Sequence, residues 1–124
     1  MMELGSTILT QQRLAKPHYI VQWKARVMTP DRQLCETYIK AVAKGGFVIN
    51  FPYALSLGSD ANIELYVEYR GKMERIRAKT RVVYCRLLSN NQGAVIELRI
   101  TFTSKEEMHI FNNVLQIFTN ANES

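Results

Sequence analysis

The sequence predicts an all-β domain of about six antiparallel strands, closed into a small barrel, with one α-helix at the C-terminal end. Apolar and polar residues alternate over most of residues 19–102, which is the period of half-buried strands. Short runs of turn residues separate these stretches. After residue 104 the apolar period becomes that of a helix. We expect the strands to close because a barrel leaves no strand edge unpaired.

Length and composition fit a single domain with its own core. The chain has 124 residues, of which 47% are hydrophobic and 22% charged, and this composition argues against disorder. The first residues have no basic region followed by a long apolar one, so we expect no secretory signal and a cytoplasmic location. We expect an irregular segment over residues 1–17, the barrel and helix over 18–120, and a tail over 121–124.

The first three strands surround a proline turn and a double glycine. Residues 19–27, "YIVQWKARV", and 34–43, "LCETYIKAVA", both alternate, and a turn at Pro30 and Asp31 separates them. On the second strand, alternation places Ile39 and Ala41 on the same face. Gly45 and Gly46 then precede a short apolar strand, "FVINF", and we expect them to allow a tight turn or bulge.

The next two strands form a hairpin whose register follows from its pattern. A two-residue turn at Arg70 and Gly71 joins "NIELYVEY" to "MERIRAKTRVVYC". This register pairs Leu65 with Ile76 and Ile63 with Ala78, and sets Glu64 opposite Arg77. The inward residues expected on the second strand are Ile76, Ala78, Thr80, Val82 and Tyr84.

The chain ends with a sixth strand and the helix. The residues expected to face inward on "AVIELRITF" are Ala94, Ile96, Leu98, Ile100 and Phe102. Ser104 and Glu107 have the spacing of a capping box, which predicts a helix start. Beyond it, a helical apolar stripe is formed by Met108, Phe111, Leu115 and Phe118, and Asn120 is the predicted end.

No catalytic or metal-binding pattern is present in the sequence. The only histidines, His18 and His109, have neither a nucleophile nor metal ligands at a recognisable spacing. Cys35 and Cys85 lie in predicted strands and form no C-x-x-C pair, so we expect buried, reduced thiols. We therefore expect no enzyme activity, no metal and no cofactor.

A basic strand is the most visible charged feature of a chain whose formal net charge is +5. Arg75, Arg77, Lys79 and Arg81 share one face. They form either a solvated face paired with Glu64 and Glu97 or an anion-binding stripe, as in barrels that bind single-stranded nucleic acid. Such barrels also stack bases on exposed aromatic residues, and only Tyr66 is expected on this face, so nucleic acid is a minor alternative.

The order and spacing of the segments resemble the PilZ domain family over roughly residues 12–118. The stretches that carry the resemblance are "KAVAKGGFVI", "LSLGSDANIELYV", "AKTRVVYC" and "AVIELRITF", followed by the helix. Members of this family are six-stranded antiparallel barrels with a C-terminal helix. Many are receptors for the bacterial second messenger cyclic di-GMP, so the resemblance implies this ligand.

The two ligand-binding motifs of the family are altered in this chain. The motif [DN]-x-S-x-x-G falls on residues 41–46, with alanine at the Asp and Ser positions and a match at the final glycine. The motif R-x-x-x-R falls on residues 12–16, with Gln and Lys at its two arginine positions. In the family the arginines hold phosphates and guanine edges, and the Asp and Ser bind a guanine. The candidate ligand-binding residues are therefore Gln12, Arg13, Lys16, Ala41, Ala43, Lys44, Gly45 and Gly46.

These departures define the expected function. Alanine forms no side-chain hydrogen bond, and each guanine group left unpaired costs about 1–3 kcal/mol. The resemblance then implies a regulatory adaptor that acts through protein partners in motility, type IV pilus assembly or secretion, with weak or absent nucleotide binding. Self-association is a further expectation from the helix stripe. The alternatives are a cyclic di-GMP receptor that uses Arg13, Lys16 and the turn at 44–46, and a basic barrel that binds single-stranded nucleic acid.

Overall fold

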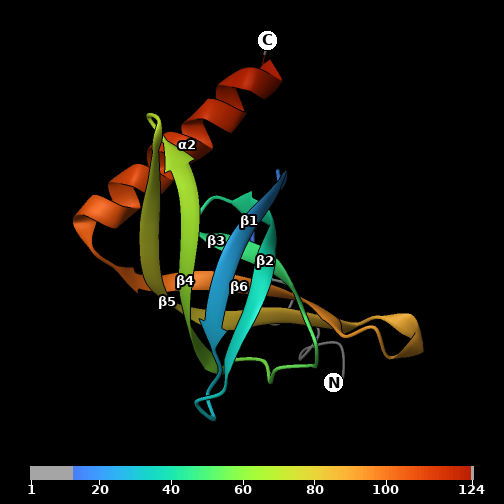
Figure 1. The fold of residues 1–124 in the computed structure, drawn as a ribbon. Helices are drawn as coiled ribbons and strands as arrows, with labels where there is room; N and C mark the ends of the chain where they lie inside the picture. The colour runs from blue at the N-terminus through green and yellow to red at the C-terminus, as the bar shows by residue number, and fades with distance from the viewer. Residues whose placement is uncertain (1–12, 124) are drawn as a thin grey trace.

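The computed structural model describes residues 13–123 and has the predicted architecture (Figure 1). Six antiparallel strands close into a barrel in the order β1-β2-β3-β6-β5-β4. The strands are β1 (Tyr19–Met28), β2 (Leu34–Ala43), β3 (Gly46–Phe51), β4 (Asp60–Tyr69), β5 (Lys72–Leu87) and β6 (Ala94–Thr103). A 3-10 turn, η1 (Ser89–Asn91), joins β5 to β6, and helix α2 (Lys105–Glu123) follows the barrel.

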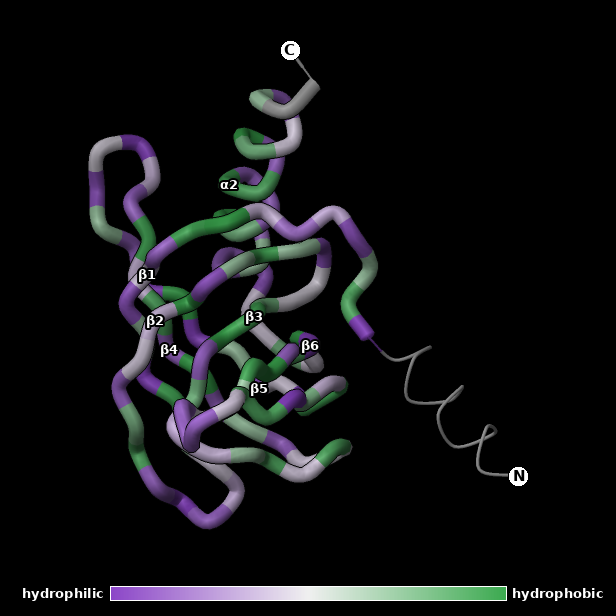
Figure 2. Tube along the Cα trace, turned by 90° about the vertical axis from the view of Figure 1, so that its right-hand side faces the viewer, coloured by the Kyte–Doolittle hydropathy of each residue, from purple (hydrophilic) through white to green (hydrophobic). Residues whose placement is uncertain are grey.

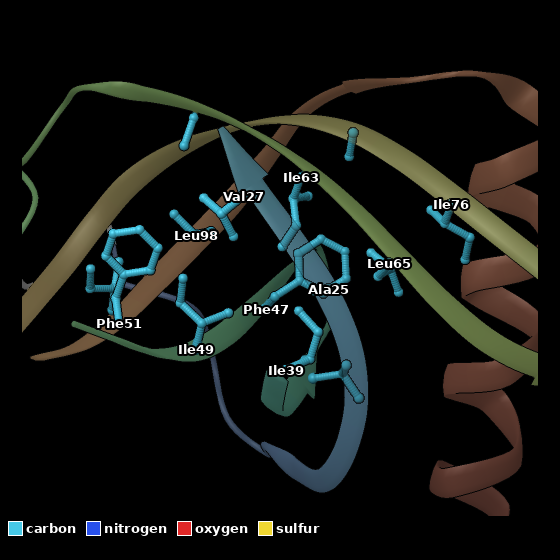
Figure 3. Packing of buried hydrophobic residues seen from close by; sticks show 14 of the residues in the cluster. Ala25, Val27, Ile39, Phe47, Ile49, Phe51, Ile63, Leu65, Ile76 and Leu98 are labelled. Carbon is cyan, nitrogen blue, oxygen red and sulfur yellow. The ribbon is translucent and has the colours of Figure 1, made fainter. Parts of the chain in front are cut away.

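Alternate side chains from all six strands fill the barrel. Figure 2 shows the alternation of hydrophilic and hydrophobic residues along the strands, and Figure 3 shows their apolar side chains pointing toward one another. The largest fully buried ones include Phe47, Phe51, Ile39, Ile49, Leu65, Ile76, Ile96 and Leu98. Their burial supplies the main driving force for closing the sheet, since burying each such side chain contributes about 1.5–3 kcal/mol.

The β4–β5 hairpin has the predicted register. Leu65 pairs with Ile76, Ile63 with Ala78, and Glu64 with Arg77. The two turn residues, Arg70 and Gly71, both have positive φ angles, of 53° and 78°. This conformation matches the right-handed twist of the strands, which is why a two-residue turn suffices.

Two register shifts correct the predicted facing of Ala41 and Tyr84. One lies between Ile39 and Ala41 in the β2–β3 pair, so that Val42 rather than Ala41 enters the core. The other lies between Val82 and Tyr84 in the β5–β6 pair. Strict alternation fails wherever one strand carries an extra residue, because every following side chain changes face. Both shifted residues consequently face outward.

Phe102 also faces outward, contrary to the prediction. In the β5–β6 pair, Lys79 aligns with Phe102 while its neighbour Thr80 aligns with Ile100. This irregularity inverts the facing of the last residues of β6. The Phe102 side chain is 65% exposed.

Helix α2 begins at the predicted cap and is docked on the core. The Ser104 hydroxyl accepts a hydrogen bond from the Glu107 backbone N–H at 3.1 Å. Phe111 is fully buried, and its ring centroid lies 5.1 Å from that of Phe47. The helix continues past the predicted end at Asn120 to Glu123, and its last turns extend beyond the barrel (Figure 1). In the part of the chain that the structure describes, no helix is long and apolar enough to cross a membrane.

Candidate functional site

A second apolar cluster lies on the outer face of the barrel, at the predicted motif. It comprises Ala41 and Ala43 of β2, Val48 of β3, Val83 of β5 and, beside them, Val95 of β6. Leu14, from the segment before β1, belongs to the same cluster and is only 4% exposed. We call residues 13–18 the strap, which approaches β1 along the outside of the barrel (Figure 2). The register shift in β2 is what turns these alanines toward the strap.

The two glycines serve two different structural purposes. Gly45 has a φ of +79°, the left-handed conformation that glycine adopts without strain, and it forms the β2–β3 turn. Gly46 lies beneath the strap instead. A Cβ atom at residue 46 would lie 2.3 Å from the Leu98 carbonyl oxygen and 2.6 Å from Leu14 Cδ2. Residue 46 must therefore lack a side chain for Leu14 to pack where it does.

Glu97 of β6 is the polar centre of this surface. It is 2% exposed, although it lies on the outer face of the barrel. Its carboxylate accepts hydrogen bonds from Arg13 Nη2 at 2.6 Å, from Arg13 Nε at 3.4 Å and from the Leu14 backbone N–H at 3.0 Å. The strap thus supplies both a positive charge and a backbone donor to a buried carboxylate, which a buried charge requires.

Arg13 is held by contacts with Tyr84 and Arg99 as well as by the ion pair, and its side chain is 39% exposed. Its guanidinium carbon lies 3.6 Å from the centroid of the Tyr84 ring, within the range of a cation–π contact. Arg99 Nη2 donates to the Arg13 carbonyl oxygen at 3.1 Å. The hydrogen bond with Glu97 is the main cause that raises the pKa of Arg13 above its ordinary value. The predicted pairing of Glu97 with the basic strand is thus wrong, because Arg13 takes that carboxylate.

The structure brings only part of the predicted site together. Arg13 contacts Arg99, which pairs with Gly46 of the motif turn, while Ala41 and Ala43 are buried in one cluster with Leu14. Lys16 and Lys44 are exposed. Gln12 lies outside the described residues. At this surface the chain presents an apolar contact and a carboxylate bound to its own arginine.

Sequence reasoning missed Leu14, Tyr84 and Glu97 as members of this surface. The signal for Glu97 was a single acid inside the apolar strand "AVIELRITF". For Tyr84 no signal existed, because its facing depends on the register shift. Leu14 stands in a segment without periodicity, so its burial depends on contacts that only the fold creates.

The basic strand is mostly neutralised by acids. Arg75 lies 3.8 Å from Glu64, Arg77 3.8 Å from Glu107, and Arg81 3.4 Å from Asp60. The Lys79 ammonium lies 6.0 Å from the centroid of the exposed Phe102 ring. The face therefore carries paired charges and one unexpected aromatic side chain.

The remaining polar candidates form no reactive group. Among residues 13–123, no three His, Cys, Asp or Glu side chains lie close enough to hold a metal ion. Cys35 and Cys85 are free and half-buried. His18 Nε2 lies 3.3 Å from the Leu14 carbonyl oxygen, within the strap itself.

A closed six-stranded antiparallel barrel followed by a C-terminal helix is a PilZ-like fold. Among solved structures, this chain is similar to the inhibitor of motility MotI/DgrA from Bacillus subtilis, with a TM-score of 0.67 and 9% identity. The match covers 86% of this chain and 52% of that one, so the chain spans about half the length of that protein. At this identity the likeness shows the fold alone. No family model and no curated protein matches the sequence.

Proposed function

We propose that this chain is a non-catalytic, PilZ-like regulatory adaptor in cyclic di-GMP-related signalling, which acts through protein contacts and binds the nucleotide weakly or not at all. The observation that carries the proposal is that the strap covers the motif surface. Leu14 is buried on Ala41 and Ala43, and Arg13 is bound to Glu97. The residues that the family uses to bind a nucleotide are thus replaced or already bound within the chain.

Two physical costs oppose nucleotide binding at this surface. A guanine placed over Ala41 and Ala43 would find no side-chain partners, and each unpaired group costs about 1–3 kcal/mol. The Glu97 carboxylate would repel a phosphate once Arg13 moved away, since like charges brought together cost several kcal/mol. The nucleotide would also have to displace Leu14 from its apolar contacts.

The expected pathway follows from the fold likeness. The similar solved structure is that of an inhibitor of motility. Motility is therefore the first process in which to search for a protein partner, followed by type IV pilus assembly and secretion.

Isothermal titration of the full chain with cyclic di-GMP tests the proposal. We expect no saturable binding with a dissociation constant tighter than about 0.1 mM. Saturable micromolar binding would overturn the adaptor function in favour of the receptor alternative. If binding is seen, a Lys16→Ala variant tests whether it uses the predicted site, because a receptor that uses Lys16 then loses affinity.

A second candidate, binding of single-stranded nucleic acid, is favoured by one observation. Phe102 is exposed and adjoins Lys79, which provides a stacking surface beside a cation. The three ion pairs of the basic strand count against it. If this candidate is correct, affinity for a short single-stranded DNA falls steeply as salt is raised, and Phe102→Ala weakens it.

A further inference from the structure

We propose that the surface beneath the strap is a docking site for a partner segment that carries an arginine followed directly by a bulky aliphatic residue, and that the strap competes for this site. The inference rests on the proposed adaptor function and names the contact through which it would operate. The chain's own Arg13 and Leu14 occupy the site and define its chemistry.

Each barrel residue that contacts the strap binds a chemical group that another peptide segment could also supply. The Glu97 carboxylate takes a guanidinium and a backbone N–H, and the Tyr84 ring packs against the same guanidinium. Arg99 donates to the backbone carbonyl of the arginine. The apolar cluster receives the next side chain, at a spot where Gly46 leaves room for it. The site thus recognises an arginine, a peptide unit and an aliphatic side chain in sequence.

The strap is attached in a way that permits exchange. No strand ladder includes it, because β1 begins at Tyr19. Ala15, Lys16 and Pro17 are exposed, and half-buried His18 has its ring nitrogen 3.3 Å from the Leu14 carbonyl oxygen of the strap itself. The ion-paired Arg13 and the buried Leu14 are thus the anchors to the barrel. A competing segment therefore has only two residues to replace. Segments held by so few buried contacts open more readily than the core.

The chemistry favours a peptide over other occupants. A buried carboxylate beside an aromatic ring selects a guanidinium, whose planar fork gives two parallel donors, over the single point charge of a lysine. It also disfavours phosphate-bearing ligands, which carry the same sign of charge. The contacts to the backbone N–H and carbonyl add a preference for a peptide chain.

The test uses the full chain and a labelled synthetic peptide of the strap sequence, "QRLAKPH", followed by fluorescence anisotropy. The Arg13→Ala, Leu14→Ala double variant vacates the site, so we expect it to bind the peptide. Wild type should bind about tenfold or more weakly, because its own strap is present at high effective concentration. Adding Glu97→Gln to the double variant should weaken its binding of the peptide by about tenfold or more. Changing the peptide arginine to lysine should have an effect of the same size.

Matched controls separate the site from general destabilisation. The Arg86→Ala, Leu57→Ala variant removes the same two residue types from exposed positions and should behave as wild type. If circular dichroism shows that the double variant is unfolded, the Leu14→Ala single variant is used instead. The proposal is overturned if a folded vacated variant shows no saturable binding, or if it binds no better than wild type.

Two further outcomes are decisive. If light scattering shows concentration-dependent dimers of wild type that Leu14→Ala abolishes, the occupant is the strap of a second copy and the partner proposal is wrong. Cyclic di-GMP is titrated separately, so the adaptor function and this docking site can fail independently. Tight nucleotide binding overturns the former, and absent peptide binding overturns the latter.

Discussion

Gly46 shows how one residue decides what the outer face of the barrel can accept. Its backbone lies so close to the Leu98 carbonyl and to Leu14 that no Cβ fits without movement. The sequence predicts the turn at this position but not this close approach. The need for glycine at residue 46 follows from the Leu98 carbonyl of β6 as well as from the strap, and no sequence pattern indicates either contact.

Gly46→Ala should therefore destabilise the protein by about 1–3 kcal/mol, as overpacking of a tight contact does. Part of this loss would be relieved by release of the strap, since Leu14 can move and the Leu98 carbonyl cannot. Urea unfolding measures the change. Lys44→Ala, an exposed substitution two residues away, is the control and should change stability by less than about 0.5 kcal/mol. Equal stability of the two variants would refute the close contact.

The ion pair between Arg13 and Glu97 allows a second prediction at this scale. The Arg13 side chain is 39% exposed and that of Glu97 3%, so solvent screens the pair only in part. A double-mutant cycle with Arg13→Ala and Glu97→Gln should give a coupling energy of about 0.5–1.5 kcal/mol. The exposed pair Arg81–Asp60 serves as the matched control, and its coupling should be near zero. A coupling at Arg13–Glu97 no larger than that of the control contradicts the strap contact.

At the scale of elements, the sequence predicts what is periodic and misses what interrupts the period. The β4–β5 register and the helix start at Ser104 are confirmed because each rests on local pattern and local capping. The facing of Ala41, Tyr84 and Phe102 was predicted wrongly, because register shifts arise from pairing between distant strands. The helix passes Asn120 because neither glycine nor proline follows to end it.

The docking of α2 rests chiefly on Phe111, which packs on Phe47 inside the barrel. Phe111→Ala should cost about 3–5 kcal/mol of unfolding free energy, measured in urea, because it leaves a cavity in the core. Ile117→Ala is the control on the same helix. Its side chain is 60% exposed, so little stability should be lost. If both variants unfold at the parent's midpoint, the helix is not docked as described.

At the scale of the whole molecule, composition and alternation suffice to predict the barrel and its helix, and the PilZ-like fold confirms that prediction. The site is different. Arg13 was a candidate from the motif, but its partner Glu97 and the covering Leu14 come from separate parts of the chain. Only the closed barrel places residues 13, 14, 84 and 97 on one surface. No local sequence pattern predicts that these residues lie close together.

Restoration of the family motifs gives a prediction at this scale. The variant with Gln12→Arg, Lys16→Arg, Ala41→Asp and Ala43→Ser places its new Asp and Ser side chains beneath Leu14, where they are buried without partners. We expect calorimetry to show saturable cyclic di-GMP binding only after Leu14→Ala is added to these four changes. Equal binding with and without Leu14, in variants that remain folded, would show that the strap does not cover the nucleotide surface.

Hydrogen exchange of the Leu14 backbone amide, followed by NMR with and without cyclic di-GMP, tests the central claim most directly. This N–H donates to the buried Glu97 carboxylate at 3.0 Å. If the strap occupies the motif surface and the nucleotide does not displace it, the amide exchanges about tenfold or more slowly than in an unfolded chain. Its exchange rate should then stay unchanged when millimolar nucleotide is added. Unprotected exchange, or protection that is lost on adding the nucleotide, would contradict the account.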